Sequence, residues 1–231
     1  FIMSLNIVIA IYLTIVIPLS LISIVGSIAL TIFKDIIQLW KSDSLLSQAW
    51  DDSIAMLKLS HEIFQKSIES FNSPESLEEI KALKKEDRKI NDYQMTVRRK
   101  VLTHFSLDTS AREATNGLVL VDMVVDIERI GDYCKNISDL TLMKESSFNF
   151  GELSDEISKI EEEVQSRFSN TIEVIENQDE DLAFRLLDKY RKKVSSVSDK
   201  IVSDIVSGQN KLGSQSKSAA LVLYVRYLKR I

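Results

Sequence analysis

The segment from Asp126 to Ile137 reads DIERIGDYCKNI and is the most informative part of this 231-residue chain. Glu128, Asp132 and Asn136 follow one another at intervals of four residues, so on an α-helix they form one column of oxygen atoms. The isoleucines between them point to other faces, where they can pack. The segment therefore predicts a helix with one oxygen-rich face and one buried face.

Two neighbouring carboxylates and an amide oxygen suit a hard or intermediate divalent cation. Carboxylates at this spacing destabilise a helix by a few tenths of a kcal/mol, roughly, and a bound cation would reverse that effect. Arg129 offers a second way to neutralise them, and Gly131 would let another helix approach closely. Spacing alone favours an ordinary solvated face over a metal site, so both interpretations stay open at this point.

The chain beyond residue 43 predicts consecutive helices. Apolar residues recur at helical spacing over about 44–70, 74–103, 110–142, 157–175, 179–207 and 218–231. Ser73-Pro74 and Ser110 are start signals, and Asn177 to Glu180 has the form of a capping box. Three helices, a break at Gly151 and three more helices indicate a duplicated three-helix unit, with antiparallel neighbours because the connections are short. With only 6 Gly and 2 Pro, an all-β fold is excluded.

The beginning of the chain has a different composition. Residues 1–33 contain none of the 29 Lys+Arg and 34 Asp+Glu. A helix of that length reaches about 50 Å, against a hydrocarbon core of about 30 Å. We therefore expect a transmembrane helix and its junction in residues 1–40, followed by a helical domain in 41–231. Its repeats would cover about 44–146 and 151–231, the second of them truncated.

Several functional classes have little support in the composition. The net charge of −5 argues against nucleic acid as a partner, because phosphate neutralisation needs a basic face. Cys134 is the only cysteine, and His61 and His104 have no evident partners for metal or nucleophilic chemistry. There is no glycine-rich phosphate loop and no nucleophile–base arrangement. We do not expect an enzyme.

The pattern Glu-Arg-Ile-Gly-Asp-x-x-x-Asn-Ile of residues 128–137, late in the third helix of a three-helix unit, resembles the signature of the PhoU family. The resemblance implies an antiparallel bundle of two three-helix repeats that binds divalent or ferric ions. In this sequence it implies metal ligands at Glu128, Asp132, Asn136, Asp87 and Asn91, with Asp92 as a substitute. A shift of 101 residues places Lys229 on Glu128 and Asp188 on Asp87. An ammonium group cannot bind a metal, so we expect no more than one metal cluster.

A PhoU-like domain behind an apolar tract also resembles the C-terminal part of bacterial sodium/phosphate cotransporters. That resemblance implies a multi-pass plasma-membrane protein that couples sodium to phosphate uptake, with a cytoplasmic regulatory domain. Its substrate site would lie upstream of Phe1, and homo-oligomerisation stays open. The alternative is a membrane-tethered PhoU-type regulator without transport activity. A helical signalling arm is less well supported, because no heptad seam is sustained.

Overall fold

The computed structural model describes residues 44–72, 77–107, 111–142, 150–177, 179–190, 193–209 and 215–231. Its helices are α3 (Leu45–Asn72), α4 (Leu77–Leu107), α5 (Ala111–Leu142), η2 (Gly151–Leu153), α6 (Ser154–Asn177), α7 (Glu180–Tyr190), α8 (Lys193–Val206) and α9 (Gln215–Arg230). No strand occurs in these ranges. The expected all-α class is confirmed.

The expected transmembrane helix in residues 1–40 lies outside the described residues. Among the helices that are described, none combines the length and the apolar character that a membrane span requires. The division into a span, a junction and two repeats thus stays a prediction.

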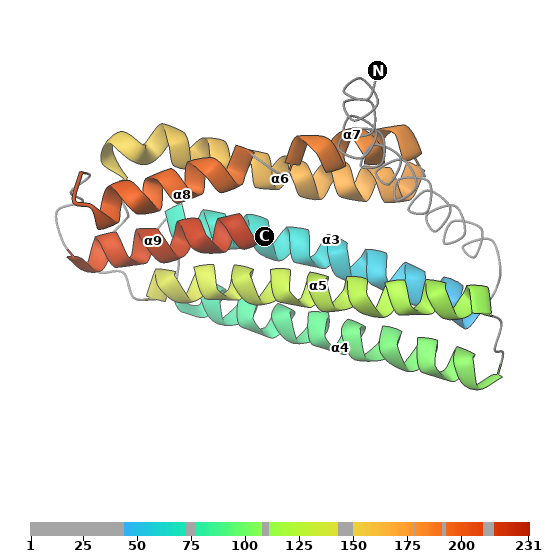
Figure 1. Cartoon of the computed structure of the whole chain (residues 1–231). Coiled ribbons are helices and arrows are strands. Elements are labelled where there is room, and N and C mark those ends of the chain that lie inside the picture. The colour runs from blue at the N-terminus through green and yellow to red at the C-terminus, as the bar shows by residue number, and fades with distance from the viewer. Residues whose placement is uncertain are drawn as a thin grey trace, which may run out of the picture.

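Helices α3, α4 and α5 form a long antiparallel bundle along one side of the molecule (Figure 1). Two ion pairs fix the register of α3 against α4: Lys66 pairs with Glu86 at 3.0 Å, and Lys100 pairs with Asp52 at 2.7 Å. The C-terminal end of α4 consequently lies beside the first turns of α3. Short connections after α3 and α4 produce this arrangement, as the sequence predicts.

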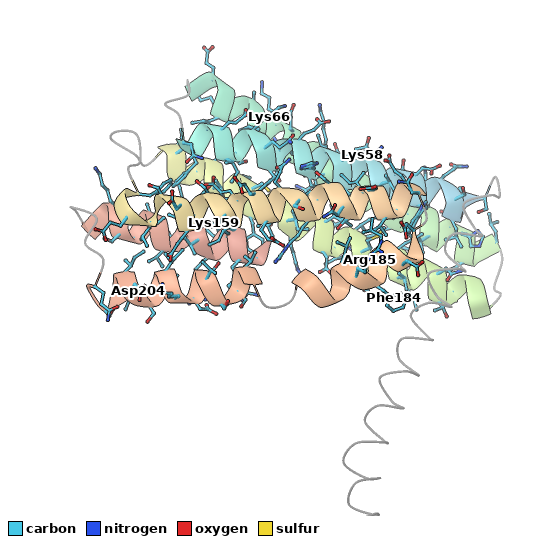
Figure 2. The ribbon with its side chains drawn as sticks, turned by 90° about the horizontal axis from the view of Figure 1, so that it is seen from above. Lys58, Lys66, Lys159, Phe184, Arg185 and Asp204 are labelled. Atoms are coloured by element: carbon cyan, nitrogen blue, oxygen red, sulfur yellow. The ribbon has the colours of Figure 1, made fainter. Side chains whose placement is uncertain are left out.

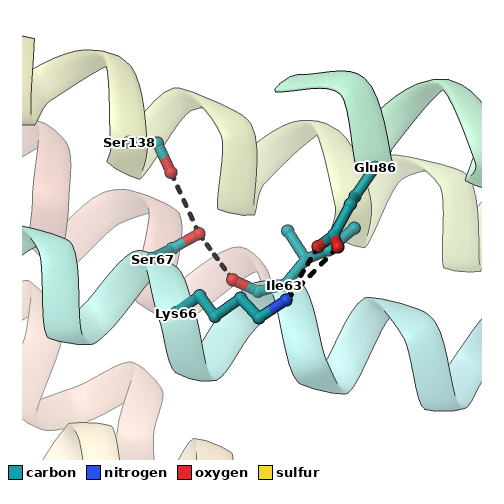
Figure 3. A network of polar contacts seen from close by, with 5 residues as sticks. All are labelled: Ile63, Lys66, Ser67, Glu86 and Ser138. Carbon is teal, nitrogen blue, oxygen red and sulfur yellow. Dashed lines mark hydrogen bonds and ion pairs between the residues drawn. The ribbon is translucent and has the colours of Figure 1, made fainter. Parts of the chain in front are cut away.

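A stripe of buried serines lets α3 pack closely against its neighbours. Ser53, Ser60 and Ser67 recur every seven residues, and each donates a hydrogen bond to the carbonyl four residues earlier, at 2.7 to 2.9 Å. Ser138 of α5 reaches the Ser67 hydroxyl at 3.1 Å (Figure 3). These bonds satisfy the hydroxyls of Ser53, Ser60, Ser67 and Ser138 inside the bundle, so small polar side chains can stand there in place of larger apolar ones.

The second half of the chain covers α3 and α5. Helix α6 runs along α3, and α9 packs on α5 and α8 (Figure 1). Lys58 of α3 lies beside α6 (Figure 2) and forms an ion pair with Glu176. An aromatic stack joins the halves: the rings of Phe71 and Tyr224 are 3.9 Å apart, and Phe150 stacks on both.

The second repeat departs from the predicted three helices. Over the segment expected as one helix, 179–207, the structure describes α7 and α8, and residues 191–192 between them lie outside the described residues. Helix α7 begins within the predicted segment, but Asn177 ends α6 and the N-cap is Asp179, whose Oδ1 accepts a hydrogen bond from the backbone N–H of Leu182 at 2.8 Å.

Candidate functional site: an acidic cluster between α4 and α5

The close contact between α4 and α5 is made at Gly131. A Cβ atom added at Gly131 would lie 2.8 Å from Cδ1 of Ile90 and 3.6 Å from Oδ1 of Asp87. Because Gly131 has no side chain, α4 approaches far enough to bring the Asp87 carboxylate against α5. Asp87 is only 6% exposed. The predicted pairing of the two helices across this glycine is therefore present.

Lys135 is the principal cation of the cluster. Its ammonium donates to Oδ1 of Asp132 at 3.0 Å and to Oδ2 of Asp87 at 3.3 Å. The hydrogen bond that Lys135 donates to Asp132 is the main reason that the pKa of Lys135 is raised, and the charge of Asp87 adds to it, although burial acts in the opposite direction. The bridge joins a buried carboxylate on α4 to a half-exposed one on α5.

Glu128 is the third carboxylate of the cluster, and it interacts with Asp87 and Asp132 through their charges. Loss of hydration raises the pKa of its carboxyl, and the negative charges of Asp132 and Asp87 raise it further. Lys135 and Arg129 act against these effects. The structure thus brings together three of the five predicted ligands, Asp87, Glu128 and Asp132, in one region of shared charge.

The two asparagines predicted as ligands do not take part in the hydrogen bonds of the cluster. Asn91 and Asn136 are half-buried on the same two helices, and among the described residues neither hydrogen-bonds to the three carboxylates. Asp92 is exposed. Arg129, considered above as the neutralising residue, instead pairs with Asp126 at 2.9 Å on the surface. Lys135, rather than Arg129, is therefore the main cation that neutralises Asp87 and Asp132.

Metal binding needs a different arrangement from the one seen here. Over the described ranges, no group of three or more His, Cys, Asp or Glu side chains is placed to hold a metal ion. The ammonium of Lys135 lies against oxygens that a metal would need, and an ammonium cannot be a ligand. The donor types suit a hard cation, but the geometry is that of an ion-paired cluster.

The second repeat carries a related pair on its surface. The ammonium of Lys229 on α9 donates to both oxygens of Asp199 on α8, at 2.7 and 2.8 Å, and Arg226 approaches at 3.4 Å. These contacts lower the pKa of Asp199. In the 101-residue shift Lys229 occupies the position of Glu128. Asp199 was not singled out, and the side chain of Asp188 lies outside those described.

Comparison with known proteins identifies the bundle that carries the cluster. Residues 54–141 match the PhoU domain. The matched range contains Asp87, Glu128, Asp132 and Lys135 and runs through most of α3, α4 and α5. No curated protein matches the sequence.

A solved structure extends the likeness beyond the matched range. The phosphate transport system regulatory protein PhoU from Streptococcus pneumoniae superimposes with a TM-score of 0.66 at 13% sequence identity. The likeness covers 80% of this chain and 86% of that chain. At this identity it establishes the fold, and it extends the PhoU-type arrangement into the second half of the molecule.

Proposed function

We propose that this chain is the C-terminal part of a sodium-dependent phosphate transporter, and that its PhoU-type helical domain regulates transport from the cytoplasmic side. The observation that carries the proposal is the PhoU match over residues 54–141, placed behind the uncharged residues 1–33. The domain offers recognition surfaces and an ion-paired cluster, while phosphate and sodium would bind upstream in the transport unit.

Regulation would act by linkage between the domain and the transport unit. A state of the domain shifts the transporter only if it interacts differently with two transporter conformations. Helix α3 is suited to carry such a bias, since it starts next to the predicted junction and packs against α4, α5 and α6. A change at the α4–α5 contact can thus reach the start of α3 through packed helices.

Metal binding at Asp87, Glu128 and Asp132 is part of the proposal, on the condition that Lys135 leaves the cluster. The carboxylate oxygens are appropriate ligands for a divalent or ferric ion, which would supply the positive charge that Lys135 supplies without it. Asn91 and Asn136 are close enough in sequence, each four residues from an acidic member, to add amide oxygens after rearrangement.

Sodium-dependent uptake of radiolabelled phosphate tests the proposal. Cells whose only other phosphate carrier does not depend on sodium would express the natural gene that encodes this chain. Uptake that requires sodium supports the transporter. Expression without any sodium-dependent uptake, accompanied by altered activity of a separate phosphate carrier, would instead support the alternative, a membrane-tethered regulator without transport.

A further inference from the structure

One face of α4 is solvent-exposed and unusually apolar. Met95, Arg98, Arg99, Leu102, Thr103 and Ser106 line an open groove of about 390 Å³. Their spacing of three and four residues places them on a single side of the helix. Leu102 is 65% exposed and Met95 is 59% exposed. We call these six residues the α4 face.

The α4 face is also positively charged. Arg98 and Arg99 are exposed, and within the described residues neither forms an ion pair, whereas the adjacent Lys100 is neutralised by Asp52 at 2.7 Å. No Asp or Glu occurs between Tyr93 and Leu107. Helix α4 as a whole holds eight Lys and Arg against five Asp and Glu, in a chain of net charge −5. The face therefore combines free cations with exposed apolar side chains.

The position of the α4 face in the bundle is equally informative. The Lys100–Asp52 pair sets it beside the first turns of α3. Leu107 at the end of α4 is 78% exposed. On α5, Leu118 is 60% exposed, and it follows Gly117, which lies beside Phe105 of α4. Exposed leucines of α4 and α5 thus lie at the end of the bundle where α3 begins.

This end is the one closest to the uncharged tract along the chain. Helix α3 starts at Leu45, and residues 34–44 separate it from the tract in residues 1–33. Eleven residues span at most about 40 Å even when fully extended, since each residue adds about 3.3–3.6 Å. If the tract is membrane-inserted, the start of α3 lies within about 40 Å of the lipid headgroups, and the α4 face lies at the same end of the bundle.

We propose that the α4 face docks on the surface of an anionic membrane. This inference rests on the membrane attachment in the proposed function. Arg98 and Arg99 would bind lipid phosphates, and Met95 and Leu102 would enter the boundary between headgroups and acyl chains, as the apolar side of an interfacial helix does. Docking would fix the orientation of the bundle relative to the bilayer and so define one of the two states that regulation requires.

The test uses the full chain reconstituted into vesicles of phosphatidylcholine, alone or mixed with phosphatidylglycerol. An environment-sensitive fluorophore is attached at Leu102→Cys, or at Val206→Cys on α8 as the matched control. The native Cys134 is fully buried and its thiol pKa is strongly raised by burial, so labelling is confined to the introduced cysteine. Lipids with brominated acyl chains report contact with the bilayer.

We expect quenching at position 102 in the anionic vesicles and not in the neutral ones, with no quenching at position 206 in either. High salt should weaken it, because screening reduces attraction to the surface. Each of Arg98→Gln and Arg99→Gln should lower the ratio of docked to undocked domain about fivefold.

Equal solvent exposure of position 102 in both kinds of vesicle would overturn the docking proposal. A signal that follows protein density rather than lipid charge would also overturn it and would assign the α4 face to a second copy. Flotation with neutral vesicles separately tests insertion of the tract. A chain that fails to float with them, but floats with anionic vesicles through Arg98 and Arg99, would refute the attachment and support the docking. A chain that binds neither would refute both.

Discussion

The ammonium group of Lys135 on α5 lies 3.3 Å from Oδ2 of Asp87 on α4, next to the point where Gly131 lets the helices meet. Asp87 is almost fully buried, and Lys135 is the cation that pairs with it. Lys135 provides in this structure the positive charge that the family resemblance assigns to a metal ion. Under the proposed function, lysine and a metal ion would compete for the same carboxylates.

Replacing Lys135 by glutamine should expose this competition. The Lys135→Gln variant leaves Asp87 and Asp132 without their cation, and we expect a loss of about 1–3 kcal/mol in the free energy of unfolding at pH 7 in a chelator. Urea unfolding followed by circular dichroism measures this loss. Adding Mn²⁺ should restore part of it in the variant and have less effect on the wild type.

Lys200→Gln is the matched control, since its partner Glu156 is 3.4 Å away in an exposed pair that contributes about 0–1 kcal/mol. A Lys135→Gln variant that is as stable as this control, with no response to Mn²⁺, would contradict the competition.

The α4–α5 contact predicts energetic coupling between Gly131 and Ile90. In Gly131→Ala the new methyl group would lie 2.8 Å from Cδ1 of the fully buried Ile90, so overpacking of about 1–3 kcal/mol should exceed the helix-propensity gain of about 1 kcal/mol. Ile90→Val removes that atom. Alone it should cost about 0.5–1.5 kcal/mol, and in the Gly131→Ala background it should cost less or become stabilising. Additive losses in urea unfolding would show that the helices do not meet here.

The buried Tyr224 hydroxyl donates a hydrogen bond to Glu161, and burial raises the pKa of the Glu161 carboxyl despite this bond. In Tyr224→Phe the carboxylate loses one of its two side-chain hydrogen bonds, since Asn72 supplies the other, and we expect a loss of about 1–3 kcal/mol at pH 7. The loss should shrink as the pH falls towards 4.5, because a protonated Glu161 does not need the donor. Tyr227→Phe on the same helix, at a half-exposed ring, is the control. A pH-independent loss would refute the charged hydrogen bond.

At the contact of α3 with α6, we expect the stability contributed by His61 to fall, rather than rise, as the pH decreases. Its ring stacks on Phe168 at 4.9 Å, and its Nε2 is 2.6 Å from the amide nitrogen of Gln165. Burial lowers the pKa of His61 below 6.5. The native state then binds fewer protons than the unfolded state, so the stability that His61 contributes is complete above pH 6.5 and falls as the pH decreases through its folded pKa.

His61→Phe keeps the ring and removes the titration, so it should lose less stability than the wild type between pH 7 and pH 5. Chemical unfolding at both pH values measures the difference. An identical loss in both proteins would mean that His61 is not held neutral at this contact.

The helices were predictable because their signals are local. The segment expected at 110–142 is α5, and a helix begins at Glu180 as expected, although its N-cap is Asp179 and not Asn177. The grouping of Asp87 with Glu128 and Asp132 followed from the family resemblance rather than from spacing, and the PhoU match covers these residues. The sequence alone left metal site and solvated face as alternatives.

The features that the sequence did not predict are contacts between segments that are distant along the chain. Lys135 stands within the quoted motif, but its bond to Asp87 requires the register of α4 against α5, which no local pattern contains. The hydrogen bond between Tyr224 and Glu161 joins residues 63 positions apart. The division between α7 and α8 was missed because apolar periodicity continues through Val194 and Ile201 on its far side.

The central claim, regulation of phosphate transport by this domain, is tested most directly by initial rates of sodium-dependent phosphate uptake. Cells would carry either the natural protein or its Asp87→Asn/Asp132→Asn variant at equal abundance, in phosphate-limited and phosphate-replete media. Allosteric coupling is typically fivefold or more in effect, so we predict that the variant changes the ratio of the two rates by at least about fivefold. The same ratio in both proteins would contradict the account.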